Sequence, residues 1–383
     1  MSPESGLKVL ITNLEMNERS GTVTYVRDLA LCLQRMGHRP MVFSPRLGAV
    51  AQELIKATVP VVDDLAKIGV EPDIIHGHHH VETMMALTHF SRTPAIFVCH
   101  DWMAWHDVPP RFPRILRYCA VDHTCLDKLV TMSGIAESAT RVLFNAVDLD
   151  RFQPRAALPA KPRRAAVFTN YSYDVQPLRE ACAQLGIALD EIGAASGTPV
   201  DAPERVLPAY DLVFAKARAA MEAMAVGCAV VVCDYRGLAG LVTTENFPPL
   251  RRLNFGARSL RHAHDVASLV REIQGYDPAE ATRVSAMMRR VGGLDALAAD
   301  LIDLYEEVIA CHARHPGSAA DEGIAIAGYL RDWSFSRGLE MERGQAEGGG
   351  LRGGLRRHLP PALLALMRRV RAAAGGALGL GTP

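Results

Sequence analysis

The first fifty residues alternate between short apolar runs and one longer amphipathic stretch. Lys8–Thr12 is a β-branched run typical of a buried strand, and apolar residues recur at helical spacing from Val23 to Leu33 before Gly37. Met41–Ser44 follows as a second predicted strand. A strand, a loop, a helix and a strand form a βαβ unit, and its right-handed crossover predicts a parallel sheet.

Similar apolar runs continue to residue 233 and predict two series of strands with helices between them. The predicted strands are Asp73–His76, Ala95–Cys99, Lys128–Thr131 and Arg141–Phe144, then Ala165–Thr169, Leu189–Ile192, Asp211–Phe214 and Cys228–Cys233. The predicted helices are Gln176–Leu185, Ala219–Val226, Val266–Ile273 and Leu294–Ile309. The fold class is therefore α/β, with two doubly wound Rossmann-like domains over residues 1–155 and 156–315. Ligands of such sheets bind beyond the carboxyl ends of the strands, in the cleft between the domains.

Composition and charge narrow the functional class. The 42 basic and 42 acidic residues cancel, whereas nucleic-acid readers usually carry a basic excess, so we expect no nucleic-acid partner. The eight cysteines form no CxxC pair, which argues against a zinc ribbon or a disulfide scaffold and favours a reducing compartment. The N-terminus lacks the pattern of a secretory signal, and the longest apolar stretch, Ala223–Cys233, is too short to span a bilayer. We expect a cytoplasmic protein.

The strand-to-helix junctions carry the candidate phosphate-binding residues. Gly21 lies before the first helix, where a backbone without Cβ lets a phosphate approach free N–H groups, although a plain turn glycine is an equal alternative. Lys216 and Arg218 follow a predicted strand and precede a short helix that contains Glu222. Two cations there can hold a diphosphate and the carboxylate can accept two ribose hydroxyls, whereas the alternative is a solvated helix start.

Histidines gather after two predicted strands. His76, His78, His79 and His80 are dense enough to suggest a metal, but no carboxylate or cysteine at ligand spacing completes a site, so we expect no metal. His100 ends the run Ala95–Cys99 and is predicted to reach the cleft, where it can hydrogen-bond a sugar hydroxyl or carry a proton. A surface histidine is the alternative.

Five segments in a fixed order resemble the GT-B fold glycosyltransferases of retaining family 4, which use nucleotide-sugar donors. The resemblance covers residues 8–310 and rests on Ser20-Gly21-Thr22, Asp73–His78, His100-Asp101, the stretch Asn145–Pro154 and the segment Glu222–Val231. It implies that 1–155 is the acceptor-side domain and 156–315 the donor domain. It also implies a nucleotide-diphosphate sugar as donor, an unidentified acceptor and no cofactor.

The resemblance also implies roles for individual residues. Gly21 would contact the donor diphosphate, His100 the donor sugar and Glu222 the ribose, so His100 and Glu222 are the candidate catalytic residues. The family usually has a second glutamate eight residues before the ribose glutamate, where this chain has Phe214. It also has two cations after the first strand of the second domain, and we expect Lys216 and Arg218 to replace them.

Three functions remain open at this stage. The first is transfer of a sugar from a nucleotide-diphosphate sugar to an acceptor, with retention, in glycan or glycoconjugate biosynthesis. The second, favoured by Phe214, is a catalytically silent GT-B module that binds nucleotide sugars or glycans. The third is a nucleotide-sugar epimerase of the same fold.

The chain changes in composition after about residue 315. Residues 316–383 form a predicted tail, partly helical or disordered, whose last part contains Arg368, Arg369 and Arg371 beside leucines and no acid. A basic segment with an apolar face binds anionic membrane surfaces, so we expect peripheral membrane contact, with a disordered end as the alternative.

Overall fold

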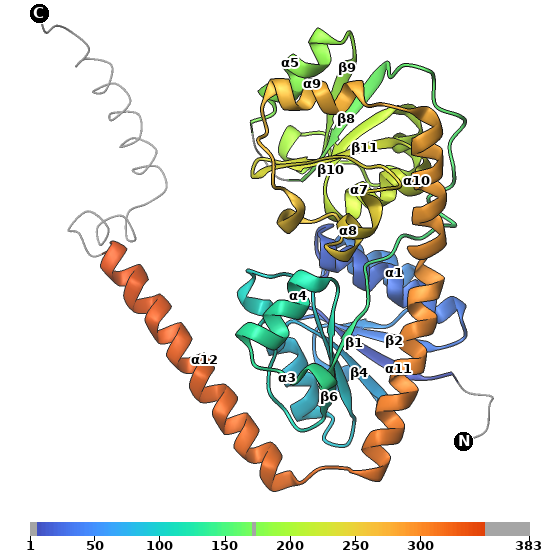
Figure 1. The fold of residues 1–383 in the computed structure, drawn as a ribbon. Helices are drawn as coiled ribbons and strands as arrows, with labels where there is room; N and C mark the ends of the chain where they lie inside the picture. The colour runs from blue at the N-terminus through green and yellow to red at the C-terminus, as the bar shows by residue number, and fades with distance from the viewer. Residues whose placement is uncertain (1–5, 171–173, 349–383) are drawn as a thin grey trace, which may run out of the picture. The chain divides into compact units, whose positions relative to one another are not determined.

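The computed structural model describes residues 6–170 and 174–348. It divides the chain into two compact units, Met1–Gly317 and Ser318–Pro383. The first unit contains two β-sheets with their helices, in agreement with the predicted α/β architecture (Figure 1). In the part of the chain that is described, no helix is long and apolar enough to cross a membrane.

The first sheet has seven strands in the order β3-β2-β1-β4-β5-β6-β7, and every neighbouring pair is parallel. Its strands are β1 (Lys8–Thr12), β2 (Arg39–Phe43), β3 (Val61–Val62), β4 (Ile74–His78), β5 (Ala95–Cys99), β6 (Ile115–Ala120) and β7 (Thr140–Val142). The order reverses between β1 and β4, because the chain first moves to one side through β2 and β3 and then returns. Such a reversal opens a crevice at the carboxyl ends of β1 and β4.

The second sheet has five strands in the order β12-β11-β10-β8-β9. They are β8 (Arg164–Phe168), β9 (Ala188–Ile192), β10 (Leu212–Ala215), β11 (Ala229–Asp234) and β12 (Gly237–Leu241), and only β12 runs antiparallel. Successive residues of β10 and β11 enter two different cores: Val213 and Val230 pack on one face, and Phe214 and Val231 on the other. A strand buried on both faces needs a continuous apolar run, which is why β11 was readily predicted.

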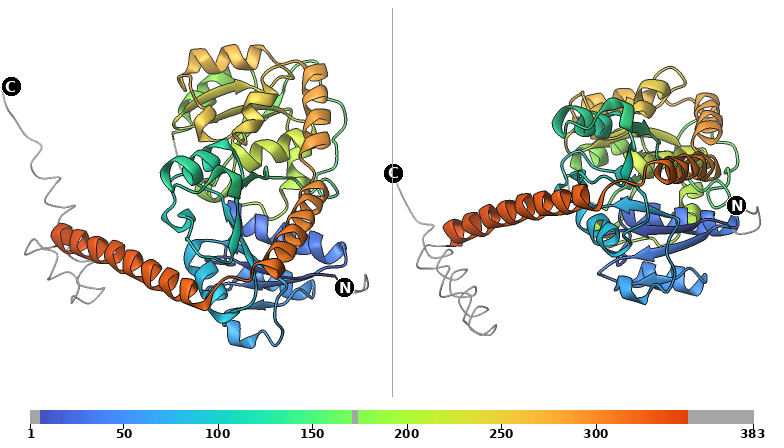
Figure 2. Two further views of the ribbon diagram at one scale, coloured as in Figure 1. Left: turned by 60° about the horizontal axis from the view of Figure 1, so that its bottom comes forward. Right: turned by 90° about the horizontal axis from the view of Figure 1, so that it is seen from below.

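The helices cover both sheets and are bounded as follows. In the first unit they are α1 (Gly21–Arg35), α2 (Ala49–Lys56), α3 (His80–His89), α4 (His123–Asp127), α5 (Gln176–Gln184), α6 (Pro203–Val206), α7 (Ala217–Val226), α8 (Phe247–Arg252), α9 (Val266–Gln274), α10 (Pro278–Val291) and α11 (Leu294–Arg314). On the second sheet, α5 packs with α9 and α7 packs with α10 (Figure 1). The helix α11 packs instead against α1 and against β5 and β6 of the first sheet (Figure 2).

One predicted strand was wrong and three strands were missed. Lys128–Thr131 is not a strand but lies in a π-helical turn, Lys128–Met132, that continues α4. Lys128 can be buried there because its ammonium group donates hydrogen bonds to two backbone carbonyls of the loop after β5. The apolar run is therefore buried by packing against that loop and does not join the sheet. The missed strands are β3, β6 and β12. The strand β3 has only two residues, β6 contains Arg117 and Tyr118, and β12 contains two glycines.

The second unit contains α12 (Ala319–Gly348), which lies in the tail that was predicted to be partly helical or disordered. The basic segment after residue 348, on which the expected membrane contact rests, lies outside the described residues.

Candidate functional site

The segment that follows β10 brings two of the predicted donor-site residues together. The helix α7 begins at Ala217, two residues earlier than predicted, so Arg218 lies in its first turn. The Nε atom of Arg218 donates to Oε1 of Glu222 one turn later, at 2.8 Å. Ala217 has a φ of +50°, a conformation rarely adopted by residues with a side chain, and such strain is concentrated at functional sites.

The same arginine reaches across to the first domain. Its Nη2 atom forms an ion pair with Asp28 of α1, and Arg151 also donates to Asp28, at 3.0 Å. Arg27 contacts the same carboxylate at 2.6 Å. Asp28 is only 3% exposed, so three guanidinium groups surround one buried carboxylate where α1 meets α7.

The charges of this network depend on each other. Burial alone raises the pKa of Asp28, but Arg218, Arg151 and Arg27 together hold that pKa below its ordinary value. Burial raises the pKa of Glu222, and the adjacent Arg218 only partly offsets this. The pKa of Arg218 is raised, since its two carboxylate partners outweigh the burial. The site is therefore a set of desolvated, mutually neutralised charges.

Lys216 and Gly21 lie at the two helix starts. Lys216 precedes α7 and forms an ion pair with Asp234 at the end of β11. Gly21 is the first residue of α1, where Ser20 caps the helix, and beyond its chain neighbours and the backbone of its own helix no atom lies within 4 Å of the place a Cβ would take. Phe214, the residue in place of the usual glutamate, is buried in the core beneath α5 and α9 of the second sheet.

His100 follows β5 at the carboxyl edge of the first sheet. Its Nε2 atom is hydrogen-bonded to Nδ1 of His78, at 2.7 Å, and its ring stands edge-on to Tyr25 with centroids 4.7 Å apart. His78 stacks near His76, whose Nδ1 is hydrogen-bonded to the hydroxyl of Tyr305 on α11. A row of buried rings therefore joins α11 to His100.

Burial keeps these histidines neutral. It lowers the pKa of His76 and of His100 to about 3, that of His79 to about 2 and that of His80 to about 4. The pKa of His78 is also well below its ordinary value, because burial and the neighbouring histidines both disfavour a charge. At neutral pH each ring can both donate and accept one hydrogen bond.

We expect the folded protein to lose stability as the pH falls below 6.5. The histidines of the unfolded chain bind protons near pH 6.5, whereas those of the folded chain stay neutral until much lower pH. Each histidine therefore lowers the free energy of unfolding by up to about 1.4 kcal/mol per pH unit, until the pH reaches its folded pKa. Asp107 opposes this, since burial raises its folded pKa to about 7. Urea denaturation at about pH 7.5 and about pH 5.5 should show a net loss of several kcal/mol. Equal unfolding free energies would contradict the neutral cluster.

Sequence reasoning missed one group of polar side chains beside the histidine row. His79, His106 and Asp107 place one ligand-type atom each within 4.8 Å of one another. The carboxylate that the histidine run lacked thus arrives from the loop after β5. The signal was present as a second histidine and aspartate, His106-Asp107, six residues after His100-Asp101, but their burial could not be inferred.

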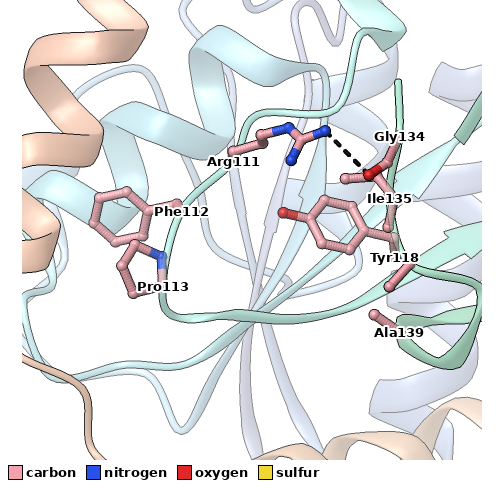
Figure 3. A pocket seen from close by; sticks show the side chains of 8 residues that line it. Arg111, Phe112, Pro113, Tyr118, Gly134, Ile135 and Ala139 are labelled. Atoms are coloured by element: carbon pink, nitrogen blue, oxygen red, sulfur yellow. Dashed lines mark hydrogen bonds between the residues drawn. The ribbon is translucent and has the colours of Figure 1, made fainter. Parts of the chain in front are cut away.

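An open hollow of about 460 Å³ lies away from these residues. It is lined mainly by the segments that precede β6 and β7, including Arg111, Phe112 and Ile135, and Figure 3 shows Arg111 directed at the carbonyl of Gly134. None of the predicted site residues lines it. It is at the amino-terminal side of the strands, opposite the edge at which ligands of parallel sheets bind.

Comparison with known proteins identifies the fold. Residues 19–151 match the family model of Glycosyltransferase Family 4. A glycosyltransferase from Rickettsia africae ESF-5 superposes with a TM-score of 0.58 at 13% identity, covering 79% of this chain and 99% of that one. HepE from Anabaena, in complex with UDP and glucose, gives a TM-score of 0.56 at 15% identity and covers 79% and 100%. Comparison with curated proteins gives no match.

These findings confirm the fold and the family resemblance drawn from the motifs. At such low identity the solved structures establish the fold, and the family model adds the relationship of the first domain. The chain has the GT-B fold, and its residues 19–151 match the family model of Glycosyltransferase Family 4.

Proposed function

We propose that this chain transfers a sugar from a nucleotide-diphosphate sugar to an acceptor hydroxyl, with retention, in glycan or glycoconjugate synthesis. The observation that carries the proposal is the Arg218–Glu222 pair on α7, which meets Asp28 of α1 between the two domains. The similar Anabaena protein is described in complex with UDP and with UDP-glucose, which supports a nucleotide-sugar donor here.

In this proposal the chain's own groups perform three tasks. Glu222 accepts the ribose hydroxyls, while Lys216, Arg218 and the free N–H groups at Gly21 neutralise the departing diphosphate. His100 contacts the donor sugar, and its neutral ring supplies a hydrogen bond without adding a charge. No metal is required, because cations and helix N–H groups together carry the leaving-group charge. The transfer is then catalysed by positioning and by exclusion of water.

A silent nucleotide-sugar-binding module is the second candidate. One observation favours it: Arg218 and Glu222 already bond to each other, and Asp28 bonds to the same arginine. A donor that uses these groups must exchange with those partners. A panel of nucleotide sugars incubated with the full chain and read by mass spectrometry separates the two functions, since transfer or hydrolysis supports the enzyme and binding alone supports the module.

We expect Glu222→Gln to weaken the binding of UDP or GDP by about 10–150-fold, because a hydrogen bond to a charged group contributes about 1.5–3 kcal/mol. The amide keeps the shape of the side chain but accepts ribose hydroxyls less strongly. Calorimetric titration measures the dissociation constant. Glu245→Gln, an exposed glutamate of the same domain, is the matched control and should bind as the wild type does. Equal binding by the Glu222 and Glu245 variants would remove Glu222 from the site.

A further inference from the structure

His79 is held in a strained conformation at the start of α3. Its φ is +60° and its ψ is +130°, although it carries a full imidazole ring, and its side chain does not cap the helix. The residue is 4% exposed and follows β4 at the carboxyl edge of the first sheet. Strain of this kind persists where the surrounding structure imposes it, and it accumulates at binding sites.

A backbone hydrogen bond determines which nitrogen of His79 carries the proton. The N–H of Leu14, in the loop after β1, donates to Nδ1 of His79 at 2.9 Å. A neutral ring that accepts at Nδ1 carries its proton at Nε2, so Nε2–H is a donor. Among the described residues this buried Nε2 atom has no hydrogen-bond partner.

Asp107 offers the complementary acceptor. It is fully buried, its Oδ1 accepts the backbone N–H of His100 at 3.2 Å, and its Oδ2 has no hydrogen-bond partner among the described residues. His106 completes the group: its Nε2 lies 4.0 Å from Oδ2 of Asp107, and its ring packs edge-on against His79 with centroids 4.3 Å apart. One ligand-type atom of each of His79, His106 and Asp107 lies within 4.8 Å of the others, so a buried donor and a buried acceptor belong to one cluster and neither is satisfied by the other.

The loop that carries Asp107 is held by its own contacts. The carboxylate of Asp101 accepts hydrogen bonds from the backbone N–H groups of Met103 and Ala104, at 2.6 and 2.7 Å. The buried ammonium of Lys128 donates to the carbonyls of Asp101 and Ala104. Lys128 begins the π-helical turn, a form of helix often found at functional sites. The loop thus presents Asp107 in a fixed position.

We propose that His79 and Asp107 bind a hydroxyl group of a carbohydrate acceptor. Such a hydroxyl accepts from Nε2–H of His79 and donates to Oδ2 of Asp107, so it satisfies both groups at once, as neither a carboxylate nor an ammonium ligand does. That the hydroxyl belongs to the acceptor substrate rests on the proposed transferase function. The hydroxyl subsite lies beside His100, since the N–H of His100 itself bonds to Asp107.

The surface beside this pair favours a carbohydrate. The ring of Trp105 packs edge-on to His106 with centroids 5.5 Å apart and is 49% exposed, and Trp102 and Met103 of the same loop are exposed as well. Aromatic and apolar side chains around a few placed polar groups are typical of small-molecule sites. A sugar ring offers both parts, with an apolar C–H face for the indole and hydroxyls at its edge.

A metal is the competing ligand for the same three residues, and the geometry disfavours it. A histidine ligand donates a ring lone pair to the metal, whereas the lone pair of His79 is directed at the N–H of Leu14. Zinc at 2.0–2.1 Å from each ligand holds the ligand atoms about 3.3 Å apart, which is closer than His106 and Asp107 lie at 4.0 Å.

The test is NMR of the full chain with methyl glycosides of glucose, galactose, mannose and N-acetylglucosamine as probes, at about pH 8, where Asp107 is ionised. We expect His79 to be protonated at Nε2 and its ring signals to shift with at least one probe. Asp107→Asn and His79→Asn should weaken the binding of that probe about 10-fold or more. His89→Asn, an exposed histidine of the same helix, should bind as the wild type does.

Three results would overturn the hydroxyl subsite. They are a failure of every probe to bind the wild type, equal binding by the Asp107 and His89 variants, and stoichiometric zinc binding that His79→Asn abolishes. UDP titration of the same samples reports on the donor site separately. If UDP does not bind while a glycoside does, the transferase proposal fails and the carbohydrate site remains.

Discussion

His100→Ala should lower turnover by about 10²–10⁴-fold, the range typical of a positioned catalytic group, with little change in nucleotide affinity. The imidazole is held from one side by His78, at 2.7 Å, and from another by the edge-on ring of Tyr25. Its orientation is therefore set before any donor binds. Because burial keeps the ring neutral, the loss removes a directed hydrogen bond and not a charge.

Single-turnover transfer with the donor found in the nucleotide-sugar panel measures this effect, and UDP titration measures the affinity. His89→Ala is the control, because it removes an exposed histidine of the same domain. Circular dichroism on each variant checks that the domain is folded. Turnover equal to that of the wild type would show that His100 is a structural member of the histidine row and that the chemistry lies elsewhere.

Arg218→Ala should lower the free energy of unfolding by about 3–5 kcal/mol, because it leaves two buried carboxylates without their main partner. Asp28 is 3% and Glu222 6% exposed, and both face Arg218. Arg151 and Arg27 still neutralise Asp28, but Glu222 loses the guanidinium of Arg218 that donates to it. Urea denaturation at neutral pH measures the loss.

Two further variants separate the buried network from an ordinary ion pair. Arg283→Ala removes an exposed pair with Glu280 and should cost less than about 1 kcal/mol. Adding Glu222→Gln to Arg218→Ala should recover part of the lost stability, since it removes the buried charge that the loss of Arg218 leaves without a partner. If Arg218→Ala costs no more than Arg283→Ala, the contact between α1 and α7 does not stabilise the fold. Nucleotide binding by Arg218→Ala is informative only once its folding is shown.

The amino-acid pattern predicted two α/β domains, and the resemblance of five segments to glycosyltransferase family 4 implied the GT-B fold. Strands such as β5 and β11 are buried on both faces and are therefore continuous apolar runs, whereas helices such as α1 have apolar residues at helical spacing along one side. Both patterns can be recognised in the local sequence without knowing which distant residues pack against them. The segment after β10 was found for the same reason, because a strand, two cations and a glycine-terminated helix follow one another in the chain.

Only the tertiary structure decided what those residues contact. Arg218 pairs with Asp28 from 190 positions away, and Tyr305 reaches His76 from 229 positions away, so neither partner has a local signature. Asp107 is polar, follows a histidine in an exposed-looking loop, and was not considered because only packing of the whole domain buries it. Periodicity reports the side of an element that faces the core, whereas charge pairing and desolvation depend on which elements meet, and that is settled by the fold as a whole.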